Sequence, residues 1–417
     1  MKITDAGLKC PINYRDGYAV HYLSEQDAYK IYMYVPFLEN HANVIGTYIY
    51  DNRDKDAKFT PEMFEEIKRQ FDHLETLRWT DTEIDYLKSI PHLKDHHGAL
   101  ELLRYIYLNK RYLRRFELDE NGQLHIEAEG PIYITSQFEI FTLEIVSYVW
   151  NMFNDTYDNI YNEGIKRWAA KAAGFEKGGK YEPLKGKIAE FGTRRRNLGE
   201  LQEFIVAQGC EAGIFSGTSN IYLAMKYGVT PIGTHAHEYF MMFQGLTGLS
   251  VAYTLEAALH EWLATFNGNL GIALTDTLTT KLFWRVFGKL FMRQFMGIRT
   301  DSGDDHEHID DAVEAYKAEG VDPATKQFLV SNSYNFDKAL EMYYYVDGRM
   351  KFAAGIGTFI TNDSTVRPLN IVMKLQYVNG NPVAKISDDL GKTLCQDPSY
   401  TRHLKEAIAW RLEHEEA

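Results

Sequence analysis

Seven short apolar segments recur between residues 188 and 357, and each ends in small or polar residues before a helical pattern begins. Such alternation is typical of parallel βαβ units, in which a crossover helix separates successive strands of one sheet. We therefore predict an α/β barrel that is irregular or incomplete, with its functional groups where strands end and loops begin. The expected strands are 188–192, 213–217, 229–234, 271–276, 297–304, 328–333 and 352–357.

The sequence on either side of these segments has a different pattern. Residues 60–115 are predicted to be helical, with Thr60 as an N-cap before Pro61 and with Thr80 and Glu83 at the spacing of a capping box. Alternating residues around an Asn-Gly pair predict one hairpin at 116–128 and another at 370–386.

These patterns place the chain in the α/β class with two domains, since 417 residues exceed the usual size of a single core. We expect a mixed α/β N-terminal domain over residues 1–140, joined by residues 365–417. Residues 141–364 are expected to form the irregular seven-stranded α/β barrel domain.

Composition excludes several classes of function. A formal net charge of −13 does not attract nucleic acid or an anionic membrane over long range, so an anionic substrate needs a locally positive pocket. Cys10, Cys210 and Cys395 form no metal-binding spacing and no disulfide framework, as expected in a reducing cytosol. The first residues lack the apolar run of a signal peptide, and no stretch approaches the ~20 apolar residues that span a bilayer. We expect a cytoplasmic protein that binds neither nucleic acid nor membrane.

Three consecutive arginines, Arg194, Arg195 and Arg196, follow the first expected strand and Gly192. The planar guanidinium group grips a carboxylate or a phosphate with two parallel hydrogen bonds. A run of arginines can equally be a solvated basic patch. The position at a strand end favours an arginine that faces the site, and the sequence leaves open which of the three it is.

The segment 216–220, Ser-Gly-Thr-Ser-Asn, precedes a predicted helix at 221–227. Free backbone N–H groups at a helix start favour an anion. The alternative is an ordinary N-cap, for which Ser219 or Asn220 would serve.

The segment 233–238 carries His235, His237 and Glu238 between a strand and a helix predicted at 237–245. Two histidines that are two residues apart do not share a helix face, which argues against a helical metal site. One histidine beside a glutamate suits nucleophilic or acid–base chemistry, and Glu238 could hold the imidazole in one tautomer. The alternative is a histidine that only caps the helix.

Two later strand ends carry further candidates. Arg299 and Asp301 lie in the segment 297–304, in which a strand leads into polar residues. Carboxylates there can bind ribose hydroxyls or Mg²⁺. Asp304 and Asp305 can alternatively just cap the next helix. The 355–357 Gly-Ile-Gly segment permits close backbone approach to a phosphate.

Read in order, these segments resemble the nicotinate phosphoribosyltransferase family of the bacterial and fungal type. The resemblance is specific because it spans most of the chain in collinear order. The matching segments are DAYK at 27–30, EFGTRRR at 190–196, SGTSN at 216–220, PIGTHAHE at 231–238, ALTDT at 273–277, IRTDSGD at 298–304, FAAGIGT at 352–358 and NIVMKLQYVNGNPVAKISDD at 370–389.

The resemblance implies that nicotinate reacts with phosphoribosyl pyrophosphate to give nicotinate mononucleotide and pyrophosphate, a step in NAD biosynthesis and salvage. It also implies coupling to ATP hydrolysis through a phosphohistidine at His237, with Glu238 beside it and with Mg²⁺ accompanying ATP and phosphoribosyl pyrophosphate. No residues are assigned as metal ligands. His235 occupies the variable position of the motif and receives no role.

The resemblance further implies a homodimer in which Tyr29 reaches across the interface and stacks on the pyridine ring. Asp301 would bond the ribose hydroxyls, and Gly355 and Gly357 would border the 5′-phosphate. The full set of implied substrate-binding residues is Tyr29, Phe191, Arg194, Arg195, Ser216, Thr218, Asp276, Arg299, Asp301, Ser302, Gly303, Gly355 and Gly357.

Two positions depart from the family pattern. Asn332 stands where an aspartate is expected, which puts a ribose or Mg²⁺ role there in doubt, and Asp305 stands where a proline is common. A nicotinamide phosphoribosyltransferase is the nearest alternative, and a quinolinate enzyme would have no use for the histidine motif. A barrel glycosidase could use Asp276 and Asp301, although it would leave the arginines and His237 idle. A non-catalytic regulator is the remaining alternative.

Overall fold

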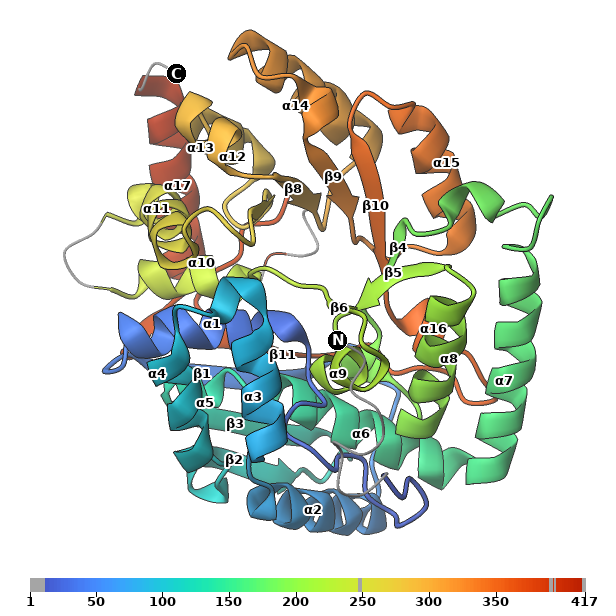
Figure 1. Ribbon diagram of the computed structural model, residues 1–417. Helices are drawn as coiled ribbons and strands as arrows, with labels where there is room; N and C mark the ends of the chain where they lie inside the picture. The colour runs from blue at the N-terminus through green and yellow to red at the C-terminus, as the bar shows by residue number, and fades with distance from the viewer. Residues whose placement is uncertain (1–11, 247–249, 390–392, 394, 415–417) are drawn as a thin grey trace. The chain divides into compact units, whose positions relative to one another are not determined.

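The computed structural model describes residues 12–246, 250–389, 393 and 395–414 (Figure 1). Cys10 and most of the segment tested for a signal peptide lie outside the described residues. None of the described helices combines the length and the apolar character needed to cross a membrane.

Strands β1 (Ile45–Asn52), β2 (Leu113–Leu118), β3 (Leu124–Pro131), β11 (Ile371–Val378) and β12 (Asn381–Pro382) form a sheet in the order β12-β11-β1-β3-β2. Both predicted hairpins are confirmed as antiparallel pairs, β2 with β3 and β11 with β12. In the second turn Asn379 and Gly380 have φ values of 51° and 77°. Two successive positive φ values are what a tight Asn-Gly hairpin turn requires, so the sequence signal has a local physical cause.

The helices predicted for residues 60–115 begin where their caps predict. Thr60 accepts a hydrogen bond from the Met63 N–H, and Thr80 forms the capping box with Glu83. Phe64 and Phe71 of α2 pack against Phe116 of β2, so the apolar face of this helix covers the sheet. The helices of this part of the chain are α1 (Ala28–Glu39), α2 (Pro61–Thr76), α3 (Asp81–Ser89), α4 (His97–Leu102), α5 (Ile132–Thr135), α6 (Phe138–Asn154) and α7 (Tyr157–Ala173).

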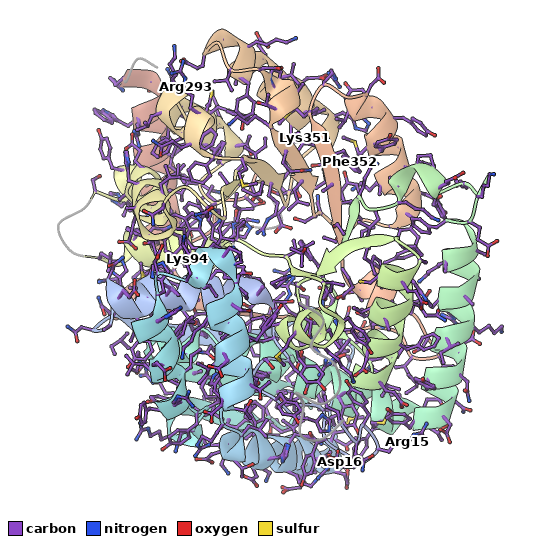
Figure 2. The ribbon with its side chains drawn as sticks, in the orientation of Figure 1. Arg15, Asp16, Lys94, Arg293, Lys351 and Phe352 are labelled. Atoms are coloured by element: carbon purple, nitrogen blue, oxygen red, sulfur yellow. The ribbon has the colours of Figure 1, made fainter. Side chains whose placement is uncertain are left out.

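All seven predicted barrel strands are confirmed, and they form one parallel sheet in the order β6-β5-β4-β10-β9-β8-β7. The chain reaches each new strand through helices, as the alternating pattern predicted. Lys351 and Phe352, labelled in Figure 2, mark the amino-terminal end of β10. The strands are β4 (Ile188–Glu190), β5 (Phe215–Thr218), β6 (Thr230–Pro231), β7 (Ile272–Leu274), β8 (Gly297–Thr300), β9 (Gln327–Val330) and β10 (Lys351–Ile356).

The intervening helices vary in length, which makes the barrel irregular. In Figure 1, α14 and α15 flank the strands β8, β9 and β10. Strands β6 and β7 are the two edges of the sheet, so the barrel is open. The hydroxyl group of Thr234 donates a hydrogen bond to the Ile272 carbonyl of β7. The helices are α8 (Gly199–Glu211), α9 (Ile221–Tyr227), α10 (His237–Gln244), α11 (Thr254–Phe266), α12 (Thr280–Val286), α13 (Lys289–Gln294), α14 (Asp305–Ala318), α15 (Phe336–Val346), α16 (Thr358–Thr361) and α17 (Pro398–His414).

The chain forms two compact units. Unit 1 contains Met1–Ala42, Tyr48–Gly233 and Ile356–Lys374, and unit 2 contains Asn43–Thr47, Thr234–Gly355 and Leu375–Ala417. This division assigns strands of the parallel sheet to different units. Its bounds differ from the domain boundaries at 140 and 364 that the sequence predicted. Those domain boundaries stay a prediction.

Candidate active site

Unit 2 gathers a cluster around His237, the first residue of α10. The ammonium group of Lys385 lies 2.9 Å from Nε2 of His237, and the Asp301 carboxylate lies 3.3 Å from the same nitrogen. Lys385 also contacts Asp276 at 2.7 Å. Asp276 follows β7 and Asp301 follows β8, so the ends of two strands deliver the carboxylates, as expected at such an edge.

The imidazole of His237 is held by a hydroxyl group. Its Nδ1 lies 3.0 Å from Oγ1 of Thr277. Glu238 is buried, but among the described residues it is not a partner of either ring nitrogen of His237. Thr277 is thus the recorded partner of Nδ1, and a role for Glu238 beside His237 stays a prediction.

The electrostatics of the cluster favour a neutral imidazole and ionised carboxylates. Burial lowers the pKa of His237, and the positive charge of Lys385 lowers it further. Burial alone would raise the pKa of Asp301, but the adjacent His237 side chain and the charge of Lys385 hold it well below the usual range. A neutral imidazole keeps a lone pair, which nucleophilic work on a phosphate requires.

The same cluster has the geometry of a cation site. One ligand atom from each of His237, Asp276 and Asp301 can be chosen so that all three lie within 4.8 Å of one another. Carboxylate oxygens are the ligands that Mg²⁺ prefers, and the Lys385 ammonium already neutralises part of their charge. The donor set therefore fits a magnesium ion that is held mainly by the two carboxylates.

The neighbouring predicted residues of unit 2 support these carboxylates. The Ser302 hydroxyl donates to Asp276 over 2.5 Å, and that of Ser331 donates to Asp301 over 3.2 Å. Gly303 has a φ of 79°, and a Cβ there would lie 2.5 Å from His308, so only glycine fits. Arg299 lies on β8, close enough for its charge to lower the pKa of Asp301.

Several residues of unit 2 have structural roles instead. Asp304 caps α14 by accepting a hydrogen bond from the His306 N–H, and Asp305 accepts hydrogen bonds from Thr300 and Tyr334. His235 is fully buried against Phe240 and Trp262, and burial lowers its pKa well below the usual range. This placement agrees with the absence of a predicted role for His235.

Unit 1 carries a second cluster, in which three cations surround one buried carboxylate. Glu139 on α6 is 1% exposed and contacts the ammonium groups of Lys30 at 2.7 Å and Lys374 at 2.8 Å. Arg194 lies 3.4 Å from the same carboxylate, and the Tyr29 hydroxyl donates to it over 3.3 Å. Three positive charges around one negative charge leave an excess of positive charge, the local condition that an anionic substrate requires.

The three adjacent arginines have different environments. Arg194 lies in the cluster around Glu139 and is partly exposed. Burial lowers the pKa of Arg195 to about 10, with Arg194 and Arg53 adding repulsion. Arg196 is buried and pairs with Glu25, so it is directed into the protein interior.

The other predicted residues of unit 1 lie around the end of β4. The Ser216 hydroxyl donates to the Ile188 carbonyl, and that of Thr218 donates to Glu190. Asn220 caps α9, as the alternative interpretation of this segment expected. A Cβ at Gly357 would lie 2.7 Å from the Phe191 carbonyl, so this glycine is required for chain packing whatever it binds. Gly355 lies in unit 2 near the end of β10.

Sequence reasoning missed Lys385, Lys374, Lys30, Glu139 and Thr277 as members of these clusters. Four of them, all except Glu139, lie within segments that carried the family resemblance, where they were quoted without a role. Glu139 had a signal of its own, because it is a carboxylate within the otherwise apolar start of α6.

Comparison with known proteins agrees with this geometry. The sequence profile described as the nicotinate phosphoribosyltransferase (NAPRTase) family matches residues 186–410, and the profile of its N-terminal domain matches residues 25–147. The chain belongs to the nicotinate phosphoribosyltransferase family. It is accordingly an enzyme, and its seven-stranded fold is the one that the resemblance implied.

Individual relatives match over nearly their whole length. A nicotinate phosphoribosyltransferase of Acinetobacter baylyi is 36% identical over 399 residues, which cover 93% of this chain and 96% of the relative. The crystal structure of nicotinate phosphoribosyltransferase from Vibrio cholerae has a TM-score of 0.85 at 32% identity and covers 94% of each chain. That from Porphyromonas gingivalis has a TM-score of 0.86 at 26% identity, covering 94% of this chain and 100% of its own.

Proposed function

We propose that this nicotinate phosphoribosyltransferase transfers the phosphoribosyl group of phosphoribosyl pyrophosphate to nicotinate. The ring nitrogen of nicotinate attacks the anomeric carbon, and the bond from that carbon to the pyrophosphate oxygen breaks. The products are nicotinate mononucleotide and pyrophosphate, which places the enzyme in NAD biosynthesis. The observation that carries the proposal is the His237, Asp276, Asp301 and Lys385 cluster in a chain of this family.

The reaction needs orientation and charge stabilisation more than proton transfer, because the pyridine nitrogen already has a lone pair. We assign the positive cluster of unit 1 to the substrate anions, with Arg194 and Arg195 as guanidinium donors. Tyr29 supplies an aromatic face for the pyridine ring, and Phe191 adds a second apolar group. In unit 2, Asp301 is assigned to the ribose hydroxyls and Arg299 to a substrate anion. Asp276, supported by Ser302, belongs to the same carboxylate set.

ATP hydrolysis is proposed to be coupled through His237. The lone pair of Nε2 attacks the γ-phosphorus and forms a nitrogen–phosphorus bond, while ADP leaves with the electrons of the broken phosphorus–oxygen bond. Water later cleaves the phosphohistidine to inorganic phosphate. A phosphate on His237 adds close to two negative charges beside Lys385 and Asp301, and this changes how the cluster binds pyrophosphate.

The remaining assignments are parts of the same proposal. Mg²⁺, held by Asp276 and Asp301, supplies charge neutralisation for the phosphates when it is bound. Ser216, Thr218, Gly303, Gly355 and Gly357 are assigned to the phosphate-binding loops, and Glu238 supports the start of α10. The enzyme is proposed to be a cytoplasmic homodimer in which Tyr29 reaches across the interface and stacks on the pyridine ring of the substrate in the partner subunit.

The substrate assignment is tested by comparing nicotinate, nicotinamide and quinolinate as acceptors at equal concentrations of phosphoribosyl pyrophosphate. The proposal expects kcat/KM for nicotinate to exceed that for nicotinamide by at least about a hundredfold, because an arginine pairs with a carboxylate and not with a neutral amide. Preference for nicotinamide would replace the proposal with the nearest alternative, and turnover of none of the three would contradict it.

A further inference from the structure

Arg196 differs from Arg194 because its side chain is buried and is bonded to several groups of unit 1. Its side chain is 4% exposed, and Nη2 donates to the Glu25 carboxylate over 2.7 Å and to the Ala19 carbonyl over 2.9 Å. Nη1 donates to Gln202 over 3.1 Å. A buried guanidinium group with this many partners is held in one geometry.

The two ends of the Arg196–Glu25 pair belong to the two segments that carry the proposed substrate residues. Arg196 ends the short 3₁₀ turn Thr193–Arg195, and its carbonyl accepts a hydrogen bond from Ser147. Glu25 stands two residues before Asp27, the N-cap of α1, and it accepts backbone hydrogen bonds from His21 and Tyr22. The pair therefore joins the backbone of the arginine turn to the backbone at the start of α1.

Both segments converge on Glu139. The Tyr29 hydroxyl lies 3.3 Å from one oxygen of this carboxylate, and Arg194 Nη1 lies 3.4 Å from the other. These separations are long for hydrogen bonds, so a small shift of either segment would break them. We infer that Arg196 and Glu25 form a buried brace that positions Arg194 for nicotinate in its own subunit and Tyr29 for nicotinate in the partner subunit, and that Arg196 itself touches no substrate. This inference rests on the proposed function.

A second carboxylate, Glu144, provides an internal control. Its Oε2 lies 3.6 Å from Nη2 of Arg196, and neither of its oxygens has a hydrogen-bond partner among the described residues. Burial raises the pKa of Glu144 well above its usual range, which the charge of Arg196 offsets only in part. Burial also acts on Glu25, but Arg196 and His21 lower its pKa to about 2. Glu25 therefore carries the negative charge that is bonded to Arg196, whereas burial favours the neutral form of Glu144 and its oxygens make no hydrogen bond among the described residues.

The experiment compares Glu25→Gln with Glu144→Gln, measuring kcat and KM for nicotinate and the melting temperature of each full-length variant. Each replaces a buried carboxyl group beside the same guanidinium with an amide, but only Glu25 is hydrogen-bonded to that guanidinium. We expect Glu25→Gln to raise KM for nicotinate about tenfold or more with a smaller change in kcat, since displacements near 1 Å can cost about a hundredfold. Glu144→Gln is expected to keep KM within about twofold of the wild type.

Equal KM values in the two variants, whether both raised or both unchanged, would overturn the brace. If Glu25→Gln does not fold, Arg196→Lys supplies the test, because lysine keeps the charge but cannot bond Glu25, Ala19 and Gln202 together. A raised KM in Arg196→Lys with an unchanged melting temperature supports positioning, and an unchanged KM contradicts it. A wild-type enzyme that does not turn over nicotinate would contradict the proposed function and not the brace.

Discussion

The Lys385 ammonium group lies 2.9 Å from Nε2 of His237. An ammonium group can only donate, so Nε2 accepts and carries the lone pair, while Nδ1 carries the proton and faces Thr277 at 3.0 Å. The geometry thus favours one tautomer of a neutral imidazole, with Nε2 as the nitrogen that the proposed phosphorylation would use. It also makes Lys385 the first group that an incoming phosphate on this nitrogen would meet.

Replacing Lys385 with methionine is expected to raise the pKa of His237. After burial, the charge of Lys385 is the largest cause of the lowered value, and Asp276 and Asp301 would then stabilise the imidazolium unopposed. The pKa can be followed by NMR titration of the imidazole. Lys385→Arg keeps the charge and should leave the pKa lowered; a Lys385→Met variant with the wild-type pKa would refute this explanation.

Replacing Asp301 with asparagine is expected to raise the Mg²⁺ concentration needed for half-maximal activity by about tenfold, equivalent to about 1.4 kcal/mol. The change removes one of the two carboxylates that can hold the ion. Chelation with EDTA should abolish wild-type activity, and added Mg²⁺ should restore it. Asp304→Asn is the matched control, because Asp304 only caps α14. The same Mg²⁺ dependence in both variants would rule out this metal site.

Glu190 should make the stability of the protein depend on pH. Burial raises its pKa from 4.5 to about 7. Between pH 4.5 and 7 the folded state therefore binds more protons than the unfolded state, so the free energy of unfolding falls as pH rises, by about 3 kcal/mol in total. Urea denaturation of wild type and Glu190→Gln across this range measures it. Parallel pH profiles for the two proteins would show that Glu190 does not titrate there.

The capping box at the start of α3 is expected to contribute stability without affecting activity. Thr80→Ala removes hydrogen bonds to the Glu83 backbone and side chain and should lower the free energy of unfolding by about 1 kcal/mol in urea. Thr76→Ala is the control, because its exposed hydroxyl bonds only to the His73 carbonyl one turn earlier. A loss of stability in the control equal to that of Thr80→Ala would contradict the capping explanation.

The fold could be predicted from the sequence because its signals are local. Barrel strands such as β4 and β9 are short runs whose side chains are largely buried, and each predicted cap acts on its own first turn. The Asn379-Gly380 turn is equally local. The division into compact units could not be predicted, because it depends on long-range contacts that leave no trace in a short window of sequence.

The candidate site was predictable only where a motif placed a side chain at a strand end. Asp276, Asp301 and His237 satisfy that condition. Lys385 does not, because it lies in the hairpin predicted at 370–386 and not at the end of a barrel strand, although it is 4% exposed. Glu139 pairs with residues far away in the sequence, and such pairing is decided by the fold. The contact between Thr277 and His237 likewise joins residues 40 positions apart in the chain.

The central claim is that His237 couples ATP hydrolysis to the formation of nicotinate mononucleotide. The direct measurement is product formation from nicotinate and phosphoribosyl pyrophosphate, with and without ATP, by the wild type and by His237→Asn. The account predicts that ATP stimulates the wild type, whereas His237→Asn retains only the slow transfer seen without ATP. Full stimulation by ATP in His237→Asn would contradict the claim.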